Sequence, residues 1–221
     1  MNRFVATDLE GTLSTGEAWR GIGAYFTTHG RKRAHQLFLA THILTVLFAR
    51  IGLTDKTAFR NQWLVDQAKL FKGYSAQELN TLADWVVENE LWAKRHANVI
   101  DELKHHHDAG CTIILASGAY EPIANALARR LPFDHVRVLS TPLEMANGRA
   151  TGNFAGAIGV DTLKAQRVRA LIGDGQLVAA YGDTAADAPM LELSAEPVAV
   201  APDAALEKIA REKRWRILRG T

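Results

Sequence analysis

The sequence contains one cysteine, Cys111, among 221 residues, so an intramolecular disulfide is excluded. So little cysteine use is typical of a reducing compartment, and we expect a cytoplasmic protein. Neither sign of charge dominates, since 26 Lys and Arg residues stand against 24 Asp and Glu residues, for a net charge of +2. This balance gives no general basis for binding nucleic acid or an acidic membrane surface.

Long hydrophobic runs are also lacking. The longest apolar stretch, LFLATHILTVLFA at 37–49, is too short to span a bilayer and carries His42, so we expect no stable membrane insertion. The N-terminus leads directly into FVAT, from which we expect no secretory signal. We predict that 37–49 forms a helix buried against its neighbours. The alternative is a surface that meets a lipid-like substrate or a membrane.

From about residue 97, short apolar runs alternate with segments of helical spacing. Together with a first strand at 4–8, the expected strands are 112–116, 135–139, 177–182 and 197–201, and the expected helices are 121–131, 161–172, 187–194 and 203–213. Asp161 and Asp203 stand where N-caps are expected, and Asn147-Gly148 between two short runs predicts a hairpin. This order predicts an α/β protein with a Rossmann-like three-layer core and a parallel sheet.

Residues 15–96 have a different pattern. Apolar and aromatic residues recur there at helical spacing, and no convincing strand is visible. Turn signals divide this segment at Gly30, Gly52 and Gly73. We therefore predict an all-helical domain, 15–96, inserted after the first strand of a core made of 1–14 and 97–221.

Polar residues follow three of the predicted strands. They are Asp8 with Glu10, Ser117 with Gly118, and Asp183 with Asp187, while Lys164 adds a cation near the start of a helix. Ligands collect at the carboxyl ends of parallel strands, so these side chains are expected to converge. Converging carboxylates need a compensating cation, and an all-oxygen site suits Mg²⁺. A carboxylate nucleophile, a hard cation and an anion cradle together describe phosphoryl transfer.

These motifs resemble those of the haloacid dehalogenase superfamily, and within it the phosphoserine-phosphatase-like branch. The matching segments are DLEGT at 8–12, ASG at 116–118, Lys164 in DTLKAQRVRAL, GDTAADAPML at 182–191, and the tail from Pro197. Their order and spacing both agree with the branch. The resemblance covers the predicted core, and it implies that the helical insert is the cap domain of this family.

The resemblance implies roles for five residues in the reaction itself. Asp8 would be the nucleophile that becomes an aspartyl-phosphate. Glu10 would be the general acid and base, which protonates the leaving oxygen and later activates water. Ser117 and the Gly118 N–H would hold the phosphate, and Lys164 would neutralise it.

The same resemblance implies a Mg²⁺ site. Asp8 and Asp183 would ligate the ion through their side chains, and Glu10 would do so through its backbone carbonyl. Asp187 would support the metal or its waters. Two positions depart from the usual pattern of the branch, because Glu10 stands where Asp is common and Ala186 where phosphoserine phosphatases commonly carry Asn. A Glu can perform the same proton transfers in a slightly wider pocket.

The expected activity is Mg²⁺-dependent hydrolysis of a small phosphate monoester through an aspartyl-phosphate, with the insert closing over the core to exclude water. An aspartyl-phosphate also permits transfer to an acceptor other than water. A third possibility is a non-catalytic phosphate-binding protein, with Glu10 and Ala186 as marks of lost chemistry. The substrate, a small phosphorylated molecule, and the oligomeric state are left open by the sequence.

Individual features have simpler explanations too. The Asp-x-Glu-Gly run at 8–11 could form a turn and a helix cap, and Ser117-Gly118 could be an ordinary turn pair. Lys164 could be a solvated helix lysine. The tryptophans of the insert are expected to pack its core, although one could line a substrate pocket; they are Trp19, Trp63, Trp85 and Trp92.

Overall fold

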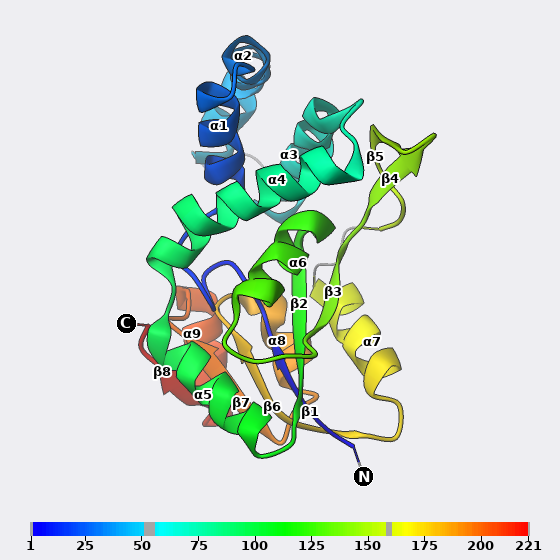
Figure 1. The fold of residues 1–221 in the computed structure, drawn as a ribbon. Helices are drawn as coiled ribbons and strands as arrows, with labels where there is room; N and C mark the ends of the chain where they lie inside the picture. The colour runs from blue at the N-terminus through cyan, green and yellow to red at the C-terminus, as the bar shows by residue number, and fades with distance from the viewer. Residues whose placement is uncertain (1, 51–55, 158–160, 221) are drawn as a thin grey trace.

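A parallel β-sheet forms the centre of the molecule. The computed structural model describes residues 2–50, 56–157 and 161–220, with the backbone alone for 43–50, 56–60 and 161. The sheet has the order β3-β2-β1-β6-β7-β8, and each neighbouring pair is parallel (Figure 1). The strands are β1 (Arg3–Thr7), β2 (Thr112–Tyr120), β3 (Arg137–Thr141), β6 (Gln176–Gly182), β7 (Glu196–Val200) and β8 (Arg216–Leu218).

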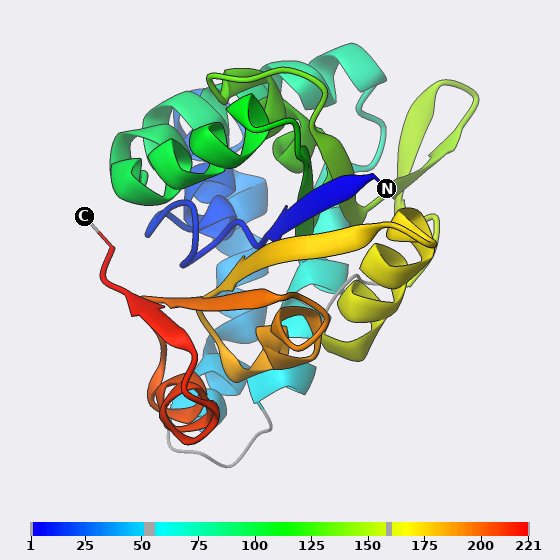
Figure 2. The same ribbon diagram turned by 90° about the horizontal axis from the view of Figure 1, so that it is seen from below.

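Helices cover both faces of this sheet, which gives the three layers that the sequence predicts. Successive strand residues point to opposite faces, so Val5 packs in one apolar cluster and Ala6 in the other. One face carries α5 (Ala97–Asp108) and α6 (Glu121–Arg130), and the other carries α7 (Asp161–Ile172), α8 (Ala188–Leu191) and α9 (Ala204–Lys213). Figure 2 shows the strands between these two groups of helices. The predicted α/β class is confirmed.

The segment between β1 and α5 is helical wherever the structure describes it, apart from turns and isolated bridges. Its main helices are α1 (Ala18–Thr28), α2 (Lys32–Arg50), α3 (Lys56–Ala68) and α4 (Ala76–Val86). Gly30 and Gly73 lie in turns with positive φ, as their turn signals predict, whereas Gly52 lies outside the described residues.

The two chain crossings between this insert and the core are hydrogen-bonded to each other. Ser14 Oγ donates to the Leu91 carbonyl at 2.6 Å, and the Thr15 amide donates to the Lys94 carbonyl at 3.0 Å. The His96 amide donates to the Leu13 carbonyl at 2.8 Å. The two chain segments that connect the insert to the core therefore lie side by side.

The predicted hairpin is present and reaches the insert. It consists of β4 (Leu143–Ala146) and β5 (Arg149–Phe154), joined by Asn147 and Gly148 at φ values of 52° and 73°. The Gly73 amide donates to the Ala150 carbonyl at 2.8 Å, and the Ala150 amide donates to the Tyr74 carbonyl at 2.7 Å. Figure 1 shows the hairpin beside α3 and α4. It thus forms a second support for the insert.

Several local predictions are corrected. β2 continues from 116 to Tyr120, because after a register shift Tyr120 pairs with Thr141. The helix predicted at 187–194 is shorter, since α8 covers only Ala188–Leu191, and it begins after a turn in which the Asp187 carboxylate accepts the Thr184 amide at 3.1 Å. The edge strand β8 lies in the basic C-terminal segment and was not predicted. Its Arg216 pairs with Glu102 and Glu196.

The apolar stretch 37–49 lies in α2, but its burial is uneven. Phe38 is 6% exposed, whereas Leu37 is 67% and Leu39 39% exposed, so the prediction of a buried helix is wrong at both leucines. The side chains of 43–49 lie outside the described residues. Within the described chain, each helix falls short of the length and apolarity needed to cross a bilayer. The N-cap predicted at Asp203 is confirmed by its bond from the Leu206 amide at 2.7 Å, while the Asp161 side chain is outside the described part.

Candidate active site

The candidate site lies beside β1, at the point where the order of the strands in the sheet reverses. From β1 the chain adds β2 and β3 on one side, and later β6, β7 and β8 on the other. At such a switch point the loops leave neighbouring strands in opposite directions and open a crevice. Asp8 follows β1 and Asp183 follows β6, and the Asp8 amide donates to the Tyr181 carbonyl of β6 at 3.0 Å. The two predicted acids therefore meet at this crevice.

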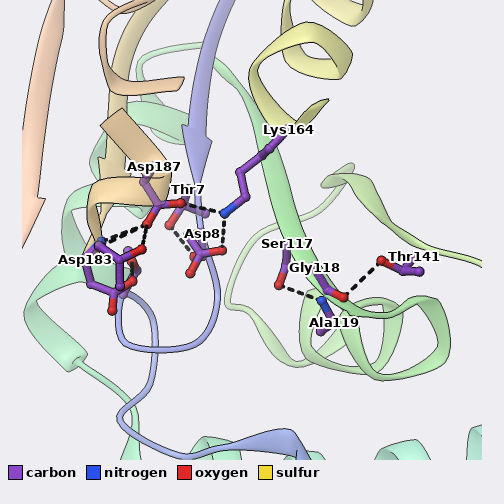
Figure 3. Close-up of polar contacts among 11 residues, drawn as sticks. Thr7, Asp8, Ser117, Gly118, Ala119, Thr141, Lys164, Asp183 and Asp187 are labelled. Atoms are coloured by element: carbon purple, nitrogen blue, oxygen red, sulfur yellow. Dashed lines mark hydrogen bonds and ion pairs between the residues drawn. The ribbon is translucent and has the colours of Figure 1, made fainter. Parts of the chain in front are cut away.

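Lys164 joins two of the acids. Its Nζ lies 2.6 Å from Asp8 Oδ1 and 2.6 Å from Asp187 Oδ1, and the Lys164 residue is only 6% exposed (Figure 3). Burial alone would lower the pKa of Lys164, but Asp8 and Asp187 raise it well above its usual value, so the ammonium stays charged. The solvated-lysine alternative is thus contradicted.

Three carboxylates lie close together here, and the Lys164 ammonium is bonded to two of them, Asp8 and Asp187. One ligand oxygen from each of Asp8, Asp183 and Asp187 lies within 4.8 Å of the others. Burial raises the pKa of Asp8 to about 6 despite Lys164, and burial together with Asp8 and Asp187 raises the pKa of Asp183 to about 8. Burial would also raise the pKa of Asp187, but Lys164 outweighs it and the pKa lies below the usual value. The cluster holds more negative charge than its lysine compensates.

A divalent cation would compensate this excess of negative charge. The donor atoms are carboxylate oxygens, which hard cations such as Mg²⁺ prefer. Asp187 is held in place, since its Oδ2 accepts bonds from the amides of Asp183 and Thr184 at 3.3 and 3.1 Å. Thr12 Oγ1 donates to Asp183 Oδ1 at 3.2 Å, so these oxygens are oriented before any ion binds. Sequence reasoning singled out neither Thr12 nor Thr184, although both lie within the matching motifs.

Gly11 makes room for this cluster. Its φ is +86°, and a Cβ there would lie 1.9 Å from Asp183 Oδ2. We expect Gly11→Ala to displace the Asp183 carboxylate and to lower the phosphate-ester hydrolysis expected from the sequence by about 10²-fold, the usual effect of an ångström-scale misplacement in an active site.

The matched control for this variant is Gly148→Ala. Gly148 also has positive φ, +73°, but a Cβ there would have no atom within 4 Å. It introduces similar backbone strain, of about 1 kcal/mol, without touching an acid. Steady-state kinetics and thermal melting of the two variants separate the effects: equal loss of activity in both would contradict the assigned role of Gly11.

Ser117 and Gly118 lie in the register-shifted part of β2. Ser117 is 2% exposed and its Oγ accepts from the Ala119 amide at 3.2 Å, while the Gly118 carbonyl accepts from Thr141 Oγ1 at 3.0 Å. Figure 3 shows this segment facing the acid cluster. The seven residues predicted from the sequence all line one cavity of about 600 Å³; they are Asp8, Glu10, Ser117, Gly118, Lys164, Asp183 and Asp187. Ala186 lines it as well.

Glu10 reaches from the core to the insert. Its Oε1 accepts a hydrogen bond from the Ala18 amide, the first of α1, at 2.5 Å. Glu17 stands at the N-cap position of α1 but makes no side-chain cap bond. Glu10 therefore supplies the cap that α1 lacks locally, which confirms the cap alternative without excluding a chemical role.

The chain is similar to several known proteins in sequence and in fold. The family model for haloacid dehalogenase-like hydrolases matches residues 5–192. The phosphoserine phosphatase SerB1 of Mycobacterium tuberculosis is 31% identical over 220 residues, which cover 95% of this chain and 68% of the relative. A histidinol-phosphatase of Neisseria meningitidis is 34% identical over 124 residues, or 52% of this chain and 55% of the relative. The crystal structure of a Bordetella pertussis protein of unknown function has a TM-score of 0.81 at 20% identity and covers 99% of this chain and 98% of its own.

Proposed function

The chain belongs to the haloacid dehalogenase-like hydrolase family, and from this premise we propose that it hydrolyses a small phosphate monoester through an aspartyl-phosphate on Asp8. The observation that carries the proposal is the position of Lys164 Nζ, 2.6 Å from both Asp8 and Asp187, in the cavity that Ser117 and Gly118 also line. A buried carboxylate beside a permanent cation suits a nucleophile that must accept a phosphoryl group.

In the first step, an Asp8 carboxylate oxygen attacks phosphorus, and the bond from phosphorus to the ester oxygen breaks. The leaving oxygen takes its proton from the Glu10 carboxyl group, so the free alcohol departs. Ser117 Oγ and backbone N–H groups of the segment after Ala116 hold the phosphoryl oxygens, and the Lys164 ammonium balances their charge. The product is an aspartyl-phosphate with Glu10 deprotonated.

In the second step, water attacks the phosphorus of the aspartyl-phosphate. Glu10 takes a proton from this water, and the bond between phosphorus and the Asp8 oxygen breaks. Inorganic phosphate is released, the Asp8 carboxylate is restored, and Glu10 is protonated again. The same residue thus moves a proton out and back in one turnover.

Asp8, Asp183 and Asp187, together with the backbone of Glu10, are the groups that would hold Mg²⁺. When bound, the ion neutralises phosphoryl charge and the excess negative charge of the acids. The insert would close over the cavity and exclude bulk water, for which the two adjacent crossings near Ser14 and Leu91 supply a hinge.

The proposed metal site predicts that Asp183→Asn raises the melting temperature in EDTA but abolishes its increase with Mg²⁺. Asp183→Asn removes the carboxylate of the cluster that is not bonded to Lys164, so in EDTA the variant should melt above the wild type by ~2–4 °C, equivalent to about 1 kcal/mol. In millimolar Mg²⁺ the wild type should gain stability and the variant should not. An equal Mg²⁺-dependent rise in both proteins would contradict the assigned ligand.

Two rival functions share this site. An aspartyl-phosphate could be transferred to an alcohol instead of water, and a phosphate-binding protein could keep the cradle without turnover. The deciding experiment is a panel of phosphomonoesters assayed with Mg²⁺ and with EDTA, with candidate alcohol acceptors added. We expect Mg²⁺-dependent release of inorganic phosphate; predominant phosphorylated alcohol would favour transfer, and binding without turnover across the panel would refute catalysis.

A further inference from the structure

Two tryptophans from separate helices form part of the wall of the reaction cavity. Trp19 lies in the first turn of α1 and Trp63 in α3, and both line the cavity that holds the acids. Their ring centroids are 5.6 Å apart with an interplanar angle of 77°, an edge-to-face pair. Leu64 and Tyr120 line the cavity beside them. The alternative that a tryptophan of the insert lines a pocket therefore holds, and it holds for two of them.

The Trp63 ring is held in place from several sides. The ring of Phe38 lies 4.8 Å from it at 76°, and the ring of His42 lies 5.5 Å from it at 70°. Trp63 is 9% exposed. Next to it, the Leu64 carbonyl accepts the Tyr120 hydroxyl at 2.7 Å, which ties α3 to β2. The aromatic wall, formed by Trp19 and Trp63, is thus a preformed, rigid surface, the kind that binds a ligand at a low entropic cost.

This wall lies on the side of the departing alcohol. The Ala18 amide holds the Glu10 carboxylate at 2.5 Å, and Trp19 is the next residue. In the proposed reaction Glu10 protonates the leaving oxygen, so the groups around its hydrogen-bond partner face the leaving group rather than the phosphate.

The charged residues of α1 at the cavity are already paired. Among the described residues of the insert that line it, the charged ones are Glu17 and Arg20, and their side chains form an ion pair with each other. Those side chains are 42% and 59% exposed, so the pair lies toward solvent. A zwitterionic leaving group would compete with this pair, whereas an uncharged ring would leave it intact.

We propose that the substrate is a phosphate monoester whose alcohol carries a planar aromatic or heteroaromatic ring, which packs against Trp19 and Trp63. This inference rests on the proposed phosphatase function and adds the class of leaving group. A flat ring gains edge-to-face contacts here, and its burial removes apolar surface of both ring and wall from water.

Binding of phosphonates tests the wall without requiring turnover. In Mg²⁺, calorimetry should show that 2-phenylethylphosphonate binds at least tenfold more tightly than ethylphosphonate, and more tightly than 2-cyclohexylethylphosphonate. Equal affinity of the phenyl and ethyl compounds would overturn the proposal. Equal affinity of the phenyl and cyclohexyl compounds would overturn the requirement for a planar ring.

Kinetics with the matching phosphates and with phosphoserine extend the test. The ratio of kcat/KM for 2-phenylethyl phosphate to that for ethyl phosphate should fall at least fivefold in Trp63→Leu and in Trp19→Ala. Trp19→Ala is the second variant because Trp19 is partly exposed in the first turn of α1, where truncation perturbs the fold less. Trp85→Phe is the control: Trp85 packs on Tyr25 at 5.7 Å and is not among the cavity residues, so the ratio should not change.

The outcomes separate this inference from the proposed function. Turnover of phosphoserine or ethyl phosphate as efficient as that of 2-phenylethyl phosphate would uphold a phosphatase and overturn the aromatic leaving group. Failure to hydrolyse all the monoesters, combined with tighter binding of the phenyl phosphonate, would overturn the phosphatase and uphold the aromatic site.

Discussion

Asp8→Asn is expected to lower kcat for every phosphomonoester substrate by on the order of 10⁴-fold or more, the scale seen when a covalent nucleophile is removed. The amide keeps the size of the carboxyl group, and its oxygen can still accept from Lys164, whose Nζ lies 2.6 Å from Asp8 Oδ1. The amide nitrogen, however, has no lone pair suited to attack on phosphorus. The loss should therefore appear in turnover and not in folding.

Release of inorganic phosphate from an aryl phosphate, measured with thermal melting of the same samples, checks this result. Asp203→Asn is the matched control, because Asp203 caps α9 through a 2.7 Å bond from the Leu206 amide and Asn caps helices equally well. That variant should retain wild-type kcat. Residual activity of Asp8→Asn above about a hundredth of wild type would contradict Asp8 as nucleophile.

A second measurement addresses the intermediate itself. If every substrate passes through the same aspartyl-phosphate, added alcohol and water compete for one species. The ratio of phosphorylated alcohol to inorganic phosphate should then be the same for substrates with different leaving groups. A ratio that changes with the leaving group would mean direct attack by the acceptor.

The core of this fold could be predicted because its signals are local. The run at 4–8 and the run at 177–182 are short, apolar and followed by acids, and parallel sheets bring such strand ends together. Asn147-Gly148 specifies its turn by itself, since both residues tolerate positive φ. The convergence of Asp8 and Asp183 followed from their places at the ends of strands, and the role of Lys164 from the family motif that it matches.

The parts that sequence reasoning missed or left open depend on contacts between distant segments. β8 is a three-residue edge strand whose sequence reads as a basic tail, and its position becomes clear only from the pairing of Arg216 with Glu102. Trp19 and Trp63 have the helical spacing of core residues, and periodicity does not distinguish a core face from a cavity wall. The sequence likewise predicts a cap at 8–11 without identifying which helix Glu10 caps.

The cap that Glu10 provides for α1 and the proton transfer that we propose for it can be separated by conservative substitutions. Glu10→Gln keeps the side-chain length and an amide oxygen that can accept the Ala18 N–H, now 2.5 Å from Glu10 Oε1, but it cannot donate or take the catalytic proton. Glu10→Asp keeps the titratable carboxyl group but is one methylene shorter, so it cannot reach the start of α1 from the same backbone position. One variant removes proton transfer and the other removes the helix cap.

Glu10→Gln should therefore lower kcat for alkyl phosphates by ~10²–10⁴-fold with little change in melting temperature. The loss in kcat/KM should be smaller for p-nitrophenyl phosphate, because its leaving group departs without protonation, whereas kcat for both substrates includes the attack of water that Glu10 assists. Glu10→Asp should retain most of the activity on both substrates but lose about 0.5–2 kcal/mol of stability, the usual value of an N-cap. Kinetics with both substrates and denaturant unfolding of both variants measure these effects.

The two variants have to be compared, because the result for either one alone has more than one explanation. If Glu10→Asp is inactive yet as stable as the wild type, the pocket requires the longer carboxyl for chemistry and the bond to α1 contributes no stability. If Glu10→Gln is fully active on alkyl phosphates, Glu10 serves only as the cap of α1, and the proton for the leaving group comes from another donor. We expect Glu10→Asp to keep its activity and lose stability, and Glu10→Gln to lose activity and keep its stability. This result would mean that one carboxylate both transfers the proton and caps the first helix of the insert. The extra methylene of Glu is then what allows it to do both.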